Sequence, residues 1–138
     1  MVATRKITLH TRGRGEVHDI TSRVKKEVDE SQVANSVVTL FVIGSTAAIA
    51  TIEYEPGLVQ DFDEAWQRLV PEGAPYRHDQ AWGESNGHSH IRATILGPSL
   101  TIPLVDRSLT LGTWQQIVLV DFDIRPRTRE IVVQVMGE

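Results

Sequence analysis

The sequence contains no cysteine. Disulfide bonds, zinc–thiolate centres and thiolate nucleophiles are therefore excluded. No apolar run approaches the roughly 20 residues that a membrane-spanning helix needs. The N-terminal residues also lack the apolar segment of a secretory signal. We therefore expect a cytoplasmic protein without a membrane partner.

Excess positive charge is also missing, since 14 lysines and arginines stand against 18 aspartates and glutamates, for a net charge of −4. A broad surface for nucleic acid or for an anionic membrane normally needs a basic face. The fingerprints G-x-x-x-x-G-K-[ST], G-x-G-x-x-G and G-x-S-x-G are absent. Nucleotide hydrolysis, dinucleotide binding and serine hydrolysis are therefore disfavoured, and any phosphate contact must come from a local pocket.

The composition that remains is typical of a globular protein, with 41% hydrophobic and 23% charged residues. A chain of 138 residues is long enough to bury a core without disulfide bonds. Neither a repeat nor a linker divides it. We expect a single domain over residues 1–138.

The first half of the chain alternates strand and helix patterns. Val2–Thr11 alternates apolar and polar residues and predicts a strand, and apolar residues four apart predict a helix within residues 19–33. Ser36–Ile43 is a nearly continuous apolar, β-branched run, typical of a strand covered on both faces. After a break at Gly44, Thr46–Tyr54 resumes a strand pattern, and Pro56 opens a second predicted helix.

The second half is predicted to be mostly β. A long polar loop is expected from Pro71 to Gly87. The strands expected after it are His88–Leu96 and Ser99–Leu104 as a hairpin, then Leu109–Leu111, Thr113–Phe122 and Arg127–Met136. The sum is about seven strands and two helices. Because few connections are long enough for a parallel crossover, we predict an α+β protein with a mixed, mainly antiparallel sheet.

Three of the five histidines lie close together in the sequence, at His78, His88 and His90, with Asn86 and Arg92 among them. On a strand, His88, His90 and Arg92 would share one face. Such a group is typical of a divalent metal site, of an anion site or of acid–base catalysis. Arg92 beside these imidazoles could bind a carboxylate or phosphate. The alternatives are that the histidines are hydrogen-bonded surface residues and that Arg92 is a solvated strand arginine.

Two polar features flank the predicted Thr46–Tyr54 strand. Ser45 and Thr46 follow a glycine in an otherwise apolar hairpin, where hydroxyl groups can bind a phosphate oxygen. The alternative for this pair is a bulge or turn. Glu53 ends the strand and could bind a metal or orient a histidine, the alternative being a solvated strand end.

Two further groups lie near the C-terminus. Thr113, Trp114 and Gln115 place an aromatic ring beside amides, which suits stacking on a heterocycle, although large aromatic residues are more often core. Three arginines share strand parity among nearby aspartates and could either gather an anion or form ion pairs in a turn. They are Arg125, Arg127 and Arg129.

The order of these motifs is also informative. The segments GSTAAIATIEYEPG, YRH…NGHSHIRA, ILGPSLTIPL, LTLGTWQQIVLVDFD and RPRTREIVVQVMGE resemble the YjbQ family, also called UPF0047. The likeness runs from Ile7 to Glu138. It implies a compact α+β fold, assembly as a homotrimer and a secondary thiamine-phosphate synthase activity. That activity joins hydroxymethylpyrimidine diphosphate to thiazole phosphate and releases diphosphate.

The resemblance also implies roles for individual residues. The motif histidines of the family fall on His78 and His90, and its hairpin hydroxyl falls on Thr46. The Thr-Trp-Gln motif falls on Thr113, Trp114 and Gln115. Many members carry a histidine where this chain has Gly44. We hypothesise that His88 supplies the missing imidazole from across the pocket.

The first functional hypothesis is therefore a transferase of the thiamine-phosphate synthase type, acting on a small phosphorylated metabolite. Its expected substrate-binding residues are Ser45, Thr46, Asn86, Thr113, Trp114, Gln115 and Arg127. Its expected catalytic residues are His78, His88, His90 and Arg92. The histidines, with Glu53, are also candidate ligands of zinc or magnesium, which leaves a metal-dependent hydrolase as one alternative. A non-catalytic metabolite- or anion-binding module is the other.

Overall fold

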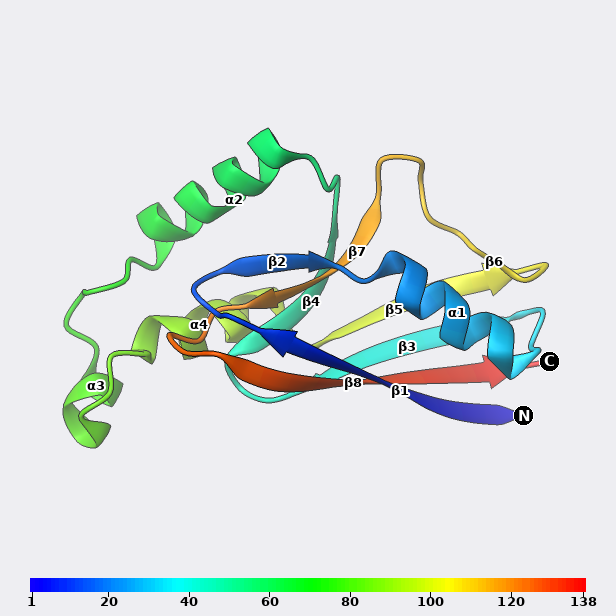
Figure 1. Cartoon of the computed structure of the whole chain (residues 1–138), viewed down its shortest axis with the longest axis horizontal. Coiled ribbons are helices and arrows are strands. Elements are labelled where there is room, and N and C mark those ends of the chain that lie inside the picture. Colours follow the sequence, from blue (N-terminus) through cyan, green and yellow to red (C-terminus); the bar gives the residue numbers. More distant parts are fainter.

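Two antiparallel sheets organise the chain in the computed structural model, which describes residues 1–138 (Figure 1). The strands are β1 (Val2–Thr11), β2 (Glu16–Asp19), β3 (Ser36–Ile43), β4 (Ala47–Ile52), β5 (Ser99–Val105), β6 (Ser108–Leu109), β7 (Gln116–Asp121) and β8 (Arg127–Gly137). The helices are α1 (Thr21–Ser31), α2 (Pro56–Leu69), α3 (Arg77–Trp82) and α4 (Gly87–Leu96). None of the four helices combines the length and apolar character needed to cross a membrane.

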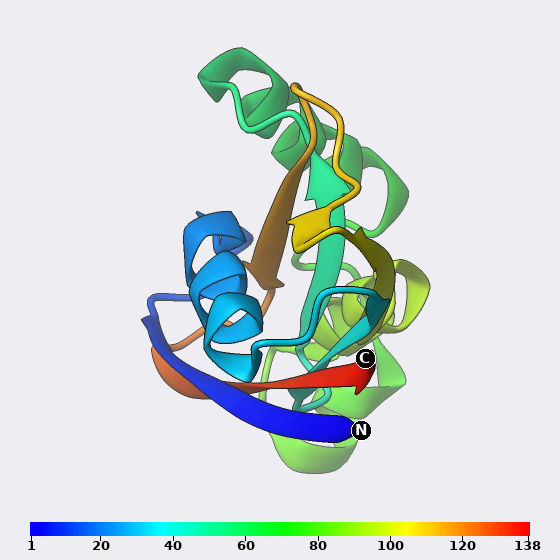
Figure 2. The same cartoon turned by 90° about the vertical axis from the view of Figure 1, so that its right-hand side faces the viewer.

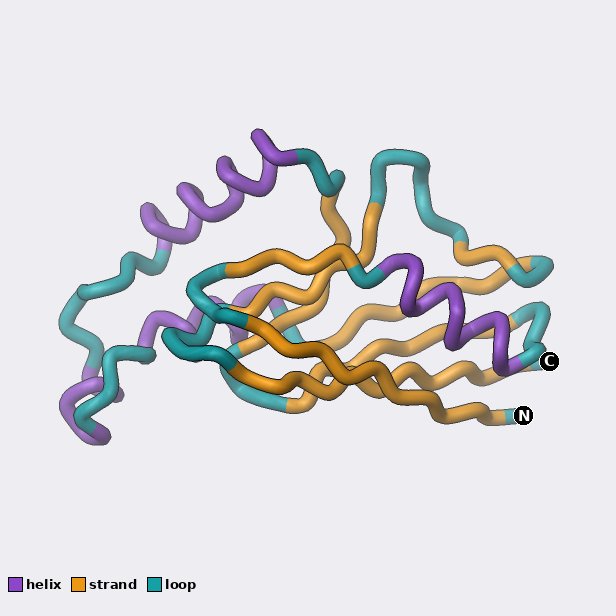
Figure 3. Tube along the Cα trace, in the orientation of Figure 1, coloured by secondary structure: helices purple, strands orange, loops and turns teal.

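The larger sheet has the order β1-β8-β3-β5-β6 and the smaller one the order β2-β7-β4. The predicted α+β class is confirmed, and so is the predominance of antiparallel pairing. Every pairing between strands is antiparallel. The expected count of seven strands and two helices was too low, because β2, α3 and α4 were not predicted (Figure 3).

Two hydrophobic cores lie on the two faces of the small sheet. Helix α1 inserts Val24 and Val28 into the first core, between the larger sheet and one face of β7. Helices α2 and α4 cover the opposite face of β7 in the second core, around Trp66 and Phe122 (Figure 2). Each fully buried aliphatic side chain contributes about 1.5–3 kcal/mol to stability. Strand β7 is therefore the strand covered on both faces.

The prediction that Ser36–Ile43 is covered on both faces was wrong. β3 alternates buried and accessible residues, and Val37, Phe41 and Ile43 on its outer face are 41–51% exposed. A β-branched apolar run indicates a strand but does not show which faces other elements cover. The outer face of β3 consequently carries apolar side chains that are accessible to solvent.

The predicted His88–Leu96 strand, with its hairpin, was also wrong, because this segment is helix α4. β5 pairs instead with β3 and β6. The loop expected over Pro71–Gly87 contains α3. On a helix, successive residues turn by about 100°, so residues two apart point in nearly opposite directions. His88 and His90 therefore cannot share one face.

Candidate functional site

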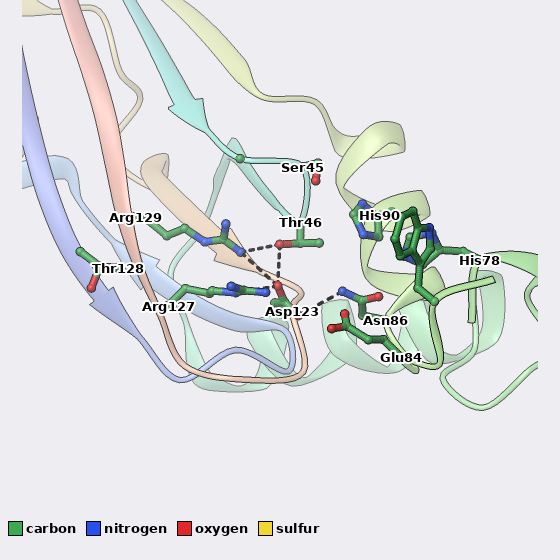
Figure 4. Close-up of a pocket in the computed structure, with 12 residues that line it drawn as sticks. Ser45, Thr46, His78, Glu84, Asn86, His90, Asp123, Arg127, Thr128 and Arg129 are labelled. Atoms are coloured by element: carbon green, nitrogen blue, oxygen red, sulfur yellow. Dashed lines mark hydrogen bonds and ion pairs between the residues drawn. The ribbon is translucent and has the colours of Figure 1, made fainter. Parts of the chain in front are cut away.

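A polar cavity of about 540 Å³ lies between the β3–β4 turn, the start of β8 and helices α3 and α4 (Figure 4). We call it the polar cavity. Half of its twelve lining residues were expected to form the site from the sequence. These are Ser45, Thr46, His78, Asn86, His90 and Arg127. Segments up to 85 residues apart in the sequence thus meet at one point.

A buried ion pair forms the back of the polar cavity. Arg129 donates two hydrogen bonds to Asp121, from Nε at 2.7 Å and from Nη2 at 2.9 Å, and Nη2 also donates to Thr46 Oγ1 at 2.6 Å. Asp121 is fully buried and also accepts a hydrogen bond from Thr11. This two-point geometry fixes the guanidinium plane, since it matches the two carboxylate oxygens. The third nitrogen, Nη1, has no protein acceptor.

Asp123 is the second buried carboxylate of the polar cavity and is only 1% exposed. It accepts hydrogen bonds from Thr46, from the Nε of Arg127 at 2.9 Å and from the backbone N–H of Ile124 at 2.7 Å. Burial alone would raise the pKa of its carboxyl, but these hydrogen bonds outweigh burial and lower the pKa below its ordinary value. Asp123 is therefore ionised at neutral pH, and it orients Arg127 toward the cavity.

Gly44 allows this arrangement. Its φ of +136° lies in a region that side chains disfavour, and a Cβ there would lie 2.6 Å from Arg129 Nη1. A side chain at this position would occupy the space of the guanidinium. Glycine therefore leaves room for Arg129.

His78 and His90 face each other across the helical side of the polar cavity. Their ring centroids are 4.5 Å apart in an edge-to-face arrangement. Burial and the neighbouring His78 lower the pKa of His90, which is therefore neutral at pH 7. A neutral imidazole beside two arginines can donate one hydrogen bond and accept another.

His88 does not join this pair, and the hypothesis that it replaces the missing imidazole is wrong. His88 is absent from the lining of the polar cavity, is buried, and has its ring centroid 6.4 Å from that of Tyr76. Burial, followed by the nearby charge of Arg92, lowers the pKa of His88. Its Nδ1 has no hydrogen-bond partner within the protein.

Arg92 lies outside the polar cavity as well. Its Nε donates to the carbonyl of Val70 at 2.9 Å, and its guanidinium carbon lies 5.9 Å from the centroid of the Phe122 ring. Burial lowers the pKa of this guanidinium, which has no carboxylate within ion-pair distance. Arg92, which belongs to α4, therefore packs against the end of α2 and the Phe122 ring.

The predicted ring-binding residues lie at the opposite end of the small sheet. β4 begins beside the polar cavity, where Ala47 pairs with Asp121, and ends where Ile52 pairs with Gln116. These ends are separated by roughly 17 Å along the strand. Near the far end, Glu53, Thr113 and Trp114 line a different hollow, and Gln115 donates to Thr51. They do not converge with the histidines.

The predicted metal centre does not fit the residues present. No three side chains from histidine, aspartate or glutamate are arranged to hold a common ion. His88 lies outside the cavity that His78 and His90 line, and Glu53 lies at the far end of β4. A divalent zinc or magnesium site needs several ligands at short range, so no step is assigned to a resident metal.

Six lining residues were absent from the expected site. They are Gly44, Trp82, Glu84, Asp123, Thr128 and Arg129. Arg129 was weighed only as one of three arginines that share parity, and Arg125 in that set pairs instead with Glu84 at 3.2 Å. The alternation of acids and arginines around positions 121–129 was the available signal. It indicated ion pairs, but it did not indicate that Arg129 also donates a hydrogen bond to Thr46 beside the β3–β4 turn.

The arrangement combines directed donors with a pair of histidines. Arg127 and Arg129 present N–H groups, Ser45 presents a hydroxyl, and two carboxylates hold the arginines in place. Such donors match the oxygens of a phosphate or carboxylate. The fold and the polar cavity therefore define a small α+β protein with a site that suits a small anion.

Comparison with known proteins agrees with this class. The family model described as "UPF0047 protein YjbQ-like" matches residues 5–138. A UPF0047 protein of Archaeoglobus fulgidus is 37% identical over 131 residues, which cover 95% of this chain and 99% of that protein. One of Methanothermobacter thermautotrophicus is 38% identical and covers 99% and 94%. The chain belongs to the UPF0047, YjbQ-like family.

Solved structures show the same fold. A "YbjQ-like protein of unknown function" from Sulfolobus solfataricus superposes with a TM-score of 0.91 at 31% identity, over 100% of both chains. A hypothetical protein from Aeropyrum pernix reaches a TM-score of 0.92 at 35% identity, over 99% of both chains. The two-sheet architecture is thus a property of these relatives too.

Proposed function

We propose that this chain is a cytoplasmic enzyme that binds the phosphate groups of a small metabolite in the polar cavity. The observation that carries this proposal is the pair of oriented arginines facing the His78–His90 pair. Arginine N–H groups match phosphate oxygens in number and direction. Since Asp121 and Asp123 balance the two arginines, selectivity would come from directed hydrogen bonds and not from excess charge.

The specific reaction we propose is the formation of thiamine phosphate, which the family resemblance implies. The bond between the methylene carbon of the pyrimidine and the diphosphate oxygen breaks, and diphosphate leaves with the electron pair. A bond forms from the thiazole nitrogen, whose lone pair supplies the electrons. In this chain Arg127 and Ser45 would hold the diphosphate, while a neutral imidazole N–H would stabilise the charge developing on it.

Titration calorimetry with inorganic diphosphate tests the binding step. Replacing Arg127 with Gln should weaken binding by about ten-fold or more, because hydrogen bonds to charged groups contribute about 1.5–3 kcal/mol. The matched control, Arg68→Gln, removes the same charge from an exposed position on α2 and should leave binding unchanged. Equal weakening in both variants would indicate nonspecific attraction and would contradict the proposal.

We also propose a homotrimer, which the resemblance implies. The outer face of the larger sheet offers apolar surface for subunit contacts, with Val37, Phe41, Ile43 and Met136 each more than 40% exposed. Analytical ultracentrifugation should give three times the chain mass of 15.4 kDa. The same measurement on Phe41→Glu should give the mass of the single chain. A monomeric parent protein would contradict this assembly.

A further inference from the structure

A second hollow lies on the other side of the histidine pair. It has a volume of about 490 Å³ and shares both His78 and His90 with the polar cavity. Its remaining walls come from the start of α4, at Gly87 and Ile91, and from the segment Pro75–Arg77, where α3 begins. We call it the second chamber. The two imidazoles therefore lie between the polar cavity and the second chamber, and both residues line each of these spaces.

The second chamber has a firm wall. The Tyr76 hydroxyl donates to the carbonyl of Pro71 at 2.6 Å, which fixes the ring at both ends. A Cβ on Gly87 would lie 2.7 Å from the Cβ of Tyr76, so glycine lets α4 approach this ring closely. The Gly87 N–H also donates to Asp79 at 2.7 Å, which ties the start of α4 to α3. These contacts fix the position of α4, which carries His90, relative to α3, which carries His78.

The lining of the second chamber differs from that of the polar cavity. Pro75, Tyr76 and Ile91 present mainly carbon, and Arg77 is the one permanently charged residue there, whereas the polar cavity combines two arginines with two carboxylates. Ile91 is 41% exposed and is not part of either hydrophobic core. An aromatic residue and a branched aliphatic residue in one lining suit a planar ring, which gains from contact with carbon and from burial of apolar area.

We infer that the second chamber binds an uncharged heteroaromatic ring of the substrate while the polar cavity binds its phosphate. This inference rests on the proposed function, and it assigns the ring to residues other than Trp114 and Gln115, which lie at the far end of β4. The histidine pair then lies between phosphate and ring. That is where the bond between them would be made or broken.

The experiment follows backbone amide resonances by NMR as pyrimidine or 4-methylthiazole is added to the full chain. The ring probes should shift the resonances of Arg77, Gly87 and Ile91. Ile91→Asp places a carboxylate in the apolar wall and should weaken ring binding by at least about five-fold. Ile95→Asp is the matched control, because Ile95 is exposed on the same helix and lies outside the second chamber.

Inorganic diphosphate titrated into the same samples separates the two proposals. Unchanged diphosphate binding in Ile91→Asp, together with lost ring binding, supports the second chamber. Ring probes that instead shift Gly44 and Thr46, or that bind Ile91→Asp as tightly as the parent, overturn it while leaving the proposed function intact. If diphosphate fails to bind the parent protein, the proposed function fails, whatever the ring probes do.

Discussion

Replacing Arg129 with Met is expected to lower the free energy of unfolding by about 3–5 kcal/mol, because it leaves a buried carboxylate without its partner. Asp121 is 0% exposed and receives two hydrogen bonds from this guanidinium. Thr46 loses a donor in the same change. Urea denaturation of the variant and the parent protein measures the difference.

Two further variants identify the cause of that loss. Lys6→Met breaks an exposed ion pair with Glu130 on the same sheet and should change stability by less than about 1 kcal/mol. Asp121→Asn combined with Arg129→Met removes the charge that the single variant leaves unpaired, so the double variant should recover part of the loss. A double variant as unstable as the sum of its single variants would show that the buried charge is not the cause.

Replacing His90 with Gln is expected to lower the turnover of the proposed reaction by about 10²- to 10³-fold, the usual cost of losing one positioned hydrogen-bond donor to a developing charge. His90 is only partly buried, so the fold should tolerate the change. Glutamine keeps a polar group of similar reach, but its flexible amide does not hold an N–H where the imidazole ring holds it. Detection of thiamine phosphate from the two phosphorylated precursors gives the rate.

His88→Gln is the matched control on the same helix. Because His88 points to the opposite side of α4, the folded fraction of this variant should retain turnover. Unchanged kinetics in His90→Gln would remove that residue from the mechanism. Equal losses in both variants would indicate a general disturbance of α4, and the histidine pair would then have no chemical role of its own.

The longer strands and the two longer helices were predictable because their patterns arise from burial. The alternation in Arg127–Met136 and the four-residue spacing of Val24 and Val28 each reflect one face turned to a core. Helix α4 was missed for a related reason. Its buried face consists of His88, Ser89, Arg92 and Ala93, so polar side chains occupy positions where apolar periodicity would be expected.

Other signals for α4 were present in the sequence. Asn86 precedes the first turn and Gly97 follows the last one, which is the usual placing of these residues around a helix. The alternating His-Ser-His-Ile-Arg segment competed with these terminal signals. Two histidines two positions apart share a face only on a strand, so one error in secondary structure misplaced both His88 and Arg92.

The polar cavity was predictable in part. Ser45, Thr46, His78 and His90 were identified from polar residues interrupting apolar patterns and from histidines close together in the sequence. The partners of the arginines were not predictable, because the contact between Arg129 and Thr46 joins residues 83 positions apart. Only the family resemblance placed the Trp114 motif in the same site as the histidines. The motif lies instead at the far end of β4, and a local sequence pattern does not show which end of a strand a neighbouring segment meets.

A crystal structure of the protein with inorganic diphosphate tests the central claim most directly. The account predicts ordered diphosphate in the polar cavity, with its oxygens within hydrogen-bonding distance of Arg127, Ser45 and the ring of His90. Diphosphate bound at another place on the surface, with these three side chains free of it, would contradict the claim.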